Sequence, residues 1–186
     1  MYVILQYKIF TLSTITTFAF IGNTRNNCSF FINQIAKIHK VLLFENSSDE
    51  KSENIYPHTK DLFTCNIEFM NCATNASWEA DIIILSAVAE DWQNIASKIK
   101  EVSTGKIVII ISDDNNQTDF KTVFNLVHPL LPHSFIIQIL KIANQKNNDD
   151  LMILNANNEE SLSTISSLFT EVGIRSISNF VHIYNN

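Results

Sequence analysis

The stretch TFAFIGNTRNNCSFFINQIAKIHKVLLFE, residues 17–45, decides the fold. Its apolar run 18–21 is typical of a fully buried strand, and Gly22 follows where a sharp turn needs permissive backbone angles. Residues 30–38 then carry apolar side chains mostly at three- and four-residue spacings, which predicts a helix with one apolar face. A second buried run occupies 41–44. Two buried strands joined by a helix of about a dozen residues predict a right-handed parallel crossover, whose carboxyl edge is the ligand-binding edge.

Strand and helix patterns continue to alternate along the chain. They predict an α/β fold, a Rossmann-like doubly wound, mostly parallel sheet in a single domain. The further strands expected are 66–70, 81–85, 106–111, 122–126, 151–155 and 175–177. The further helices expected are 73–79, 90–102, 134–143 and 159–171.

The first 16 residues stand apart from this pattern. Their loose alternation of apolar residues predicts an extra strand or an extended lead-in, followed by the Rossmann-like domain at 17–186. They lack the basic start and the small-residue cleavage site of a signal peptide, and a spanning helix would be longer and more apolar. We therefore expect no membrane partner. The polar stretch 46–60 predicts a surface connection.

Composition narrows the classes of partner. With 46% hydrophobic residues the chain can bury one core, while a net charge of −6 and a pI near 5.3 disfavour nucleic acid, which binds clustered Lys and Arg. Cys28, Cys65 and Cys72 are odd in number and lack CxxC spacing. We expect buried, reduced thiols in a cytoplasmic protein, and neither disulfides nor a metal site.

Several segments carry a family resemblance: FAFIG, IHKVLLF, ADIIILSAVAED, GKIVIIISD, VFN and DLMILNANNEESLSTISSLFTEVGIRSI. Over residues 17–180 the chain resembles the predicted dinucleotide-binding proteins grouped with the NADP oxidoreductases that depend on the deazaflavin coenzyme F420. Residues 80–113 match best, with Val88 where those proteins often have proline. The resemblance implies a Rossmann domain that binds NADP and transfers hydride to a partner cofactor or a substrate.

The nucleotide fingerprint GxGxxG would occupy residues 22–27, but only Gly22 remains of its three glycines. Thr24 stands where the second glycine lets the backbone approach the pyrophosphate, and Asn27 stands where the third allows close helix packing. A lone glycine after a strand also occurs without any ligand. Backbone N–H groups and one cation remain available to an anion at the helix start; the residues are Asn23, Thr24, Arg25 and Asn26.

Cofactor choice depends on the residues after the second strand. The resemblance places a serine and an arginine there to hold the 2′-phosphate of NADP, whereas this chain has Phe44, Glu45 and Asn46. A carboxylate about 20 residues past the turn bonds the ribose hydroxyls of NAD and repels the extra phosphate. Glu45 is also compatible with a solvated charge at a strand end. Ser47, Ser48 and Lys51 could replace some of the missing contacts to the 2′-phosphate.

Other candidate residues follow later strands. One strand ends at Ser86, Ala87 and Val88, on the side of the site where the nicotinamide is expected. The next strand ends at Ser112 and Asp113. Asn125 and His128 follow a further expected strand and are candidates for the same cleft, although a histidine beside a proline in a loop is more often ordinary surface.

Two functional hypotheses follow. The first is an NAD(P)-binding oxidoreductase-like protein with an unknown substrate and no assigned catalytic residue, favouring NAD but binding it weakly because Thr24 crowds the phosphate site. Binding of neither dinucleotide stays open. The second is a non-catalytic Rossmann-like module that acts through protein association, for example as a homodimer built on its N-terminal segment.

Overall fold

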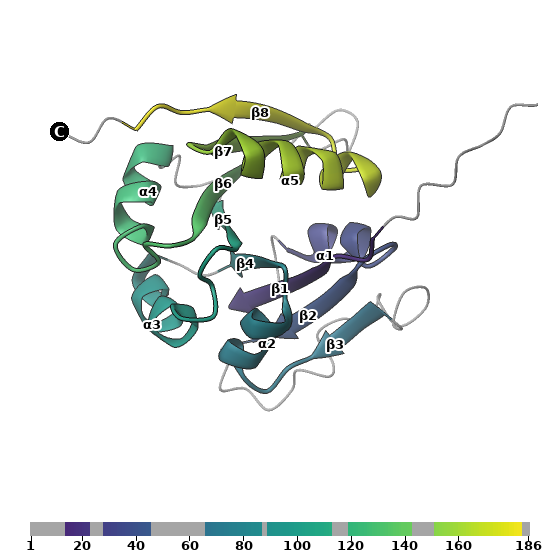
Figure 1. Ribbon diagram of the computed structural model, residues 1–186. Coiled ribbons are helices and arrows are strands. Elements are labelled where there is room, and N and C mark those ends of the chain that lie inside the picture. Colours follow the sequence, from purple (N-terminus) through teal and green to yellow (C-terminus); the bar gives the residue numbers. More distant parts are fainter. Residues whose placement is uncertain are drawn as a thin grey trace, which may run out of the picture.

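The computed structural model describes residues 14–22, 28–45, 66–86, 89–112, 119–142 and 151–183. Within these residues, eight strands form one sheet in the order β3-β2-β1-β4-β5-β6-β7-β8, and all neighbours are parallel except β6 and β7 (Figure 1). The strands are β1 Thr17–Gly22, β2 Lys40–Phe44, β3 Ile67–Phe69, β4 Ile82–Ser86, β5 Ile107–Ser112, β6 Phe135–Ile142, β7 Leu151–Ala156 and β8 Ser176–Phe180. The expected Rossmann-like, mostly parallel α/β fold is confirmed.

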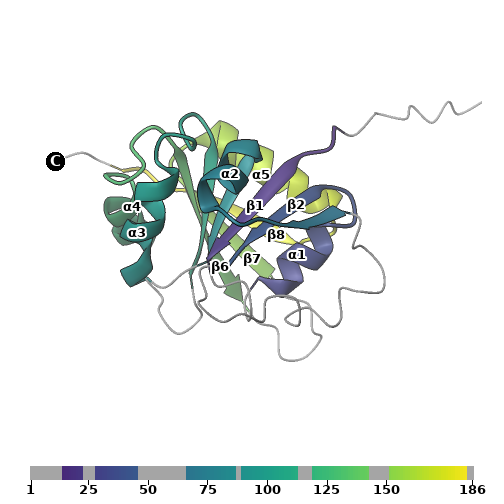
Figure 2. The same cartoon turned by 90° about the horizontal axis from the view of Figure 1, so that it is seen from below.

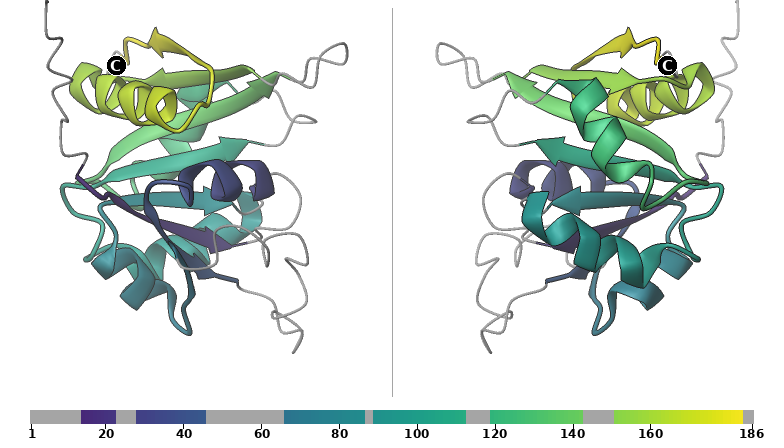
Figure 3. Two further views of the ribbon diagram at one scale, coloured as in Figure 1. Left: turned by 90° about the vertical axis from the view of Figure 1, so that its right-hand side faces the viewer. Right: turned by 90° about the vertical axis from the view of Figure 1, so that its left-hand side faces the viewer.

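Helices cover both faces of this sheet (Figures 1 and 3). One face packs against α1 Ser29–Ile35 and α5 Glu159–Glu171. The other packs against α2 Ala73–Glu79, α3 Ala89–Ile99 and α4 Phe120–Val127, and Figure 2 shows α3 and α4 on the same side. The result is a three-layer α/β/α arrangement with one apolar core on each face of the sheet.

Strand β1 is central to both cores. It pairs with β2 on one side and with β4 on the other. Phe18 and Phe20 point into the core beneath α1 and α5, while Ala19 and Ile21 point into the opposite core. A strand buried on both faces reads as a continuous apolar run, which explains why the sequence located it.

Most expected elements are confirmed, but α1 is shorter than predicted. The helix ends at Ile35, and Ile38 lies in the following turn with its side chain exposed. The N-terminal residues 1–13 and the whole expected surface connection at 46–60 lie outside the described residues. The prediction of an extra N-terminal strand therefore stays a prediction.

Two sequence-based assignments are wrong. The expected strand at 122–126 is the middle of α4, where four apolar side chains repeat at helical spacing and pack on the sheet: Phe120, Val123, Phe124 and Val127. Asp119 caps this helix, because its Oδ1 accepts the backbone N–H of Thr122 at 3.0 Å. Both the spacing and the capping residue were visible in the sequence and outweigh the β-propensity of Thr, Val and Phe.

The expected helix at 134–143 is strand β6. It lies between β5 and β7, and Ile136, Ile137 and Ile139 are buried on its two faces. Its apolar run fits either structure by periodicity alone. The density of β-branched residues was the signal for a strand.

A row of amide side chains crosses the last three strands. Gln138 on β6, Asn155 on β7 and Asn179 on β8 occupy matching register positions. Nδ2 of Asn179 donates to Oδ1 of Asn155 at 2.7 Å, and Nδ2 of Asn155 lies 3.4 Å from Oε1 of Gln138. Because Gln138 and Asn155 are buried, a slip in register would separate buried polar groups from their partners. The row therefore favours this register where the sheet turns antiparallel.

A buried histidine joins β1, β2 and α5. His39 has no exposed surface; its Nδ1 lies 3.4 Å from the backbone nitrogen of Thr16, and its Nε2 lies 3.8 Å from Oε2 of Glu171. Accepting the Thr16 N–H requires an unprotonated Nδ1, which corresponds to the neutral ring. Burial lowers the pKa of His39 below its ordinary value, and the Glu171 carboxylate partly opposes this.

This lowered pKa predicts a pH-dependent stability. The unfolded chain takes up a proton more readily than the folded one, so the stabilisation is complete above the unfolded pKa of about 6.5 and is lost as pH falls through the lower folded value. His39 should make the free energy of unfolding fall by at most about 1.4 kcal/mol per pH unit in that window. Denaturant titrations at several pH values should show a shallower dependence in His39→Asn than in wild type. The exposed control His133→Asn should keep the wild-type slope, and identical slopes in all three would contradict this role of His39.

Candidate functional site

Three predicted site residues meet at the carboxyl edge of the central strands. Gly22 ends β1 and pairs in register with Ser86, which ends β4. Glu45 follows Phe44, the β2 residue that pairs with Ile21. The sheet therefore brings together positions 22, 45 and 86, on three neighbouring strands, where the strand order reverses direction around β1. Open α/β sheets bind ligands at this kind of edge.

Gly22 has the backbone conformation that the sequence predicted. Its φ is +115°, a value that side-chain-bearing residues rarely adopt. The last position of β1 therefore favours glycine, although two later glycines of the fingerprint are missing.

Glu45 and Ser86 line the same edge with different exposure. Ser86 is buried, whereas Glu45 is half-buried and its Oε2 atom is shielded from solvent. A carboxylate at the end of β2 has the chemistry needed to accept hydrogen bonds from sugar hydroxyls.

Most of the remaining predicted site residues lie outside the described part of the chain. Only the backbone of Ser112, at the end of β5, is described. The roles assigned to the others stay predictions: Asn23, Thr24, Arg25, Asn26, Asn27, Ser47, Ser48, Lys51, Ala87, Val88 and Asp113.

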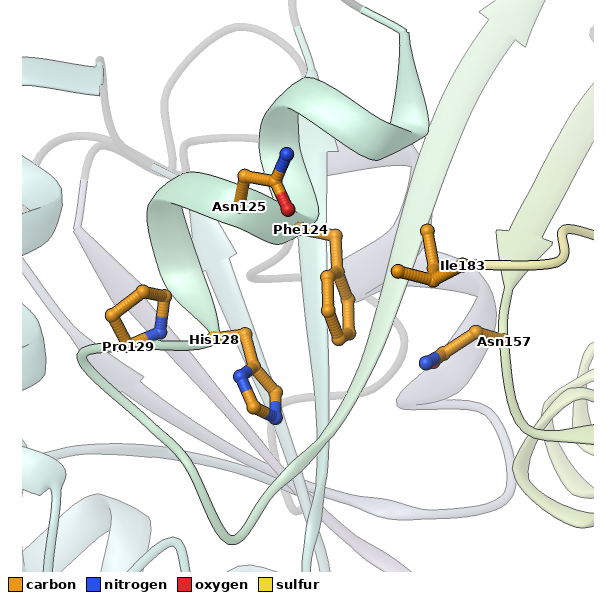
Figure 4. A pocket seen from close by; sticks show the side chains of 6 residues that line it. All are labelled: Phe124, Asn125, His128, Pro129, Asn157 and Ile183. Atoms are coloured by element: carbon orange, nitrogen blue, oxygen red, sulfur yellow. The ribbon is translucent and has the colours of Figure 1, made fainter. Parts of the chain in front are cut away.

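Asn125 and His128 do not belong to this edge, so their assignment to the same cleft is wrong. Asn125 lies on α4 and His128 caps its end, and both line a cavity of about 290 Å³ (Figure 4). The cavity also contacts Asn157, which follows β7. Because β7 runs antiparallel to β6, its end lies at the amino edge of the parallel strands. The error came from taking α4 for a strand.

The prediction that the cysteines are buried is correct for Cys28 and wrong for Cys72. Cys28 has no exposed surface, whereas Cys72, which precedes α2, is exposed; Cys65 lies outside the described residues. The backbone amides of Asn75 and Thr74 lower the pKa of the Cys72 thiol, with a smaller contribution from the charge of Lys98. Its side chain makes no well-formed cap hydrogen bond to the helix.

Two other classes of site were sought within the described residues. No group of three or more His, Cys, Asp or Glu side chains there is arranged to hold a metal ion. No helix in the same part of the chain is long and apolar enough to cross a membrane.

Comparisons with known proteins show the fold. No protein-family model and no curated protein sequence matches the chain. Among solved structures, a hypothetical protein from Sinorhizobium meliloti matches with a TM-score of 0.65 and 17% identity, over 90% of this chain and 86% of the other. An Arthrobacter protein, to which F420-dependent NADP reductase activity is attributed, matches with a TM-score of 0.65 and 11% identity, over 88% and 84%.

A pyrroline carboxylate reductase from Plasmodium falciparum, solved with NADP bound, matches with a TM-score of 0.61 and 14% identity. The match covers 88% of this chain but 57% of the reductase, so this chain spans a little over half of that enzyme's length. At such identities the likeness concerns the arrangement of strands and helices, and it leaves the chemistry to the residues of this chain.

The different surroundings of the two described cysteines predict selective alkylation. Iodoacetamide should modify Cys72 much faster than Cys28 in the native protein, since thiolate character and access both favour Cys72. Peptide mapping by mass spectrometry would follow both rates. In denaturant the two rates should converge, and equal labelling of Cys28 and Cys72 in the native state would contradict the assigned environments.

Proposed function

We propose that this chain binds a nicotinamide dinucleotide at the carboxyl edge of β1, β2 and β4, as the cofactor-binding domain of an oxidoreductase. The observation that carries the proposal is the meeting of Gly22, Glu45 and Ser86 at the point where the strand order reverses. The bound nicotinamide would supply hydride chemistry, and the chain would bind and orient it.

The described residues fit such a cofactor in three respects. Strand β1 ends on a glycine of positive φ, Glu45 carries a carboxylate directly after β2, and Ser86 provides a hydroxyl group at the end of β4. The solved structure of a reductase with NADP bound shares this fold, which supports a dinucleotide as ligand. Membership of the F420-dependent NADP reductase group is proposed on the sequence resemblance and on the Arthrobacter neighbour.

Affinity should be weak and should favour NAD. Thr24 replaces the glycine that lets the pyrophosphate approach the backbone, and losing charge-assisted contacts of about 1.5–3 kcal/mol each takes a micromolar site toward millimolar. A charge on Glu45 about 4 Å from a 2′-phosphate would disfavour NADP by about 1–4 kcal/mol.

Calorimetric titration of the whole chain with NAD and NADP tests this proposal. Wild type should bind NAD more tightly than NADP, and Glu45→Gln should reduce or reverse the difference because the repelling charge is gone. Glu101→Gln, an exposed charge removed at the opposite edge, should leave both affinities unchanged. Absence of binding for both dinucleotides at millimolar concentration would reject the function, and equal effects of the two variants would reject the role of Glu45.

The second candidate, a non-catalytic association module, is favoured by one observation. Strand β8 is an edge strand with the exposed apolar residues Ile177 and Phe180, and residues 176–180 contain neither proline nor charge. Edge strands usually carry a proline or charged side chains, which prevent pairing with another chain. The earlier argument for a homodimer rested on N-terminal residues outside the described part of the chain.

Light scattering coupled to size exclusion separates the two candidates. An association module should elute as a dimer that Ile177→Lys converts to monomer, because a charge at the edge opposes strand pairing. Leu126→Lys, a matched change of an exposed apolar residue on α4, should have no effect. A monomeric wild type over a wide concentration range would exclude self-association through β8.

A further inference from the structure

A second ligand site is indicated at the edge of the sheet opposite the proposed dinucleotide site. The cavity beside α4 measures about 290 Å³ and is lined by Phe124, Asn125, His128, Pro129, Asn157 and Ile183. Along β6, Phe135 pairs with the start of β5 and Leu140 pairs with its end. The five intervening steps separate the two edges by about 16 Å. The cavity therefore does not belong to the edge formed by Gly22 and Ser86.

Each wall of the cavity is held by hydrogen bonds of the fold. The turn after α4 is closed by the N–H groups of Leu130 and Leu131, which donate to the carbonyl of Val127 at 2.9 and 3.0 Å. On the opposite wall, the N–H of Val181 donates to the carbonyl of Ala156 at 2.8 Å and holds the chain after β8 beside Asn157. One wall is thus tied to β7 of the sheet, and the turn that forms the other wall is closed onto the end of α4.

The lining divides into an apolar and a polar part. Phe124 and His128 stack with ring centroids 4.6 Å apart, and Pro129 and Ile183 complete the apolar surface. Figure 4 shows Asn157 and Ile183 facing the Phe124 ring from the side opposite His128. Asn125, Asn157 and His128 provide groups that both donate and accept hydrogen bonds. No Lys, Arg, Asp or Glu lines the cavity.

These properties select the class of ligand. A charged molecule would lose hydration without gaining a counter-charge, which disfavours it. The volume lies just below the range of drug-sized sites, so the cavity suits one ring system and not a whole dinucleotide. An aromatic wall beside two amides fits a planar ring whose edge both donates and accepts hydrogen bonds.

We propose that the cavity formed by α4, the residue after β7 and the segment after β8 binds a small uncharged nitrogen heterocycle of the nucleobase type. The ring lies against the apolar part of the wall, and Asn157 with Asn125 bonds its amide-like edge. This site is separate from the dinucleotide site, and its occupation does not depend on the proposed function.

The test uses uracil and orotate, which share one ring and differ by a carboxylate. Both are titrated into the isotope-labelled full chain while ¹H–¹⁵N spectra are recorded. Uracil should shift the side-chain amide signals of Asn125 and Asn157 and saturate at millimolar concentration, as expected for so small a ligand. Orotate should bind at least tenfold more weakly. Saturating NAD should leave the uracil affinity unchanged.

Variants assign the binding to the cavity. Asn157→Leu should weaken the binding of uracil at least tenfold, because it removes a donor and an acceptor while keeping a similar volume. Asn125→Leu makes the same change at a second, exposed position of the lining. Asn94→Leu on the exposed face of α3 is the matched control and should bind as wild type. Unshifted backbone signals elsewhere verify folding. Failure of uracil to saturate, equal binding of orotate, displacement by NAD, or full affinity in both cavity variants would each overturn the proposal.

Discussion

The parallel pairing of β1 with both β2 and β4 is the constraint on which the rest of the structure depends. The backbone of β1 pairs with both neighbouring strands, and its side chains fill both cores. Burying residues such as Phe18 and Phe20 contributes about 1.5–3 kcal/mol each. Asp81 strengthens the start of the β1–β4 pair, since its Oδ2 accepts the N–H of Thr17 at 2.8 Å. A charge placed within β1 would disrupt both halves of the fold at once.

The sequence predicted the elements whose pattern allows one interpretation. The runs at 18–21 and 107–111 are continuous, apolar and short, and a strand buried between helix layers is the structure that such runs favour. The prediction failed at 120–127 and 135–142, where β-propensity and helical periodicity compete. There the deciding facts were the cap at Asp119 and the position of β6 between two strands. Tertiary context, which propensity does not contain, settled β6.

The two candidate sites differ in how much of each could be predicted from the sequence. Gly22, Glu45 and Ser86 follow from counting strands, because parallel strands end at a common edge. The cavity beside α4 could not be found this way. Its walls come from residues 124, 125, 128, 129, 157 and 183, which meet only because β7 reverses direction and β8 then runs parallel to it. The exposure of Cys72 and the burial of His39 likewise follow from packing around the helices.

The central claim is that the carboxyl end of β1 is the place where a dinucleotide binds. Backbone amide shifts in ¹H–¹⁵N spectra, recorded while NAD is added to millimolar concentration, test it most directly. The account predicts saturating shifts at Gly22, Glu45 and Ser86, with little change at Asn157 and Ile183. Shifts confined to the edge that carries Asn157, or none at Gly22 and Ser86 while NAD binds, would contradict it.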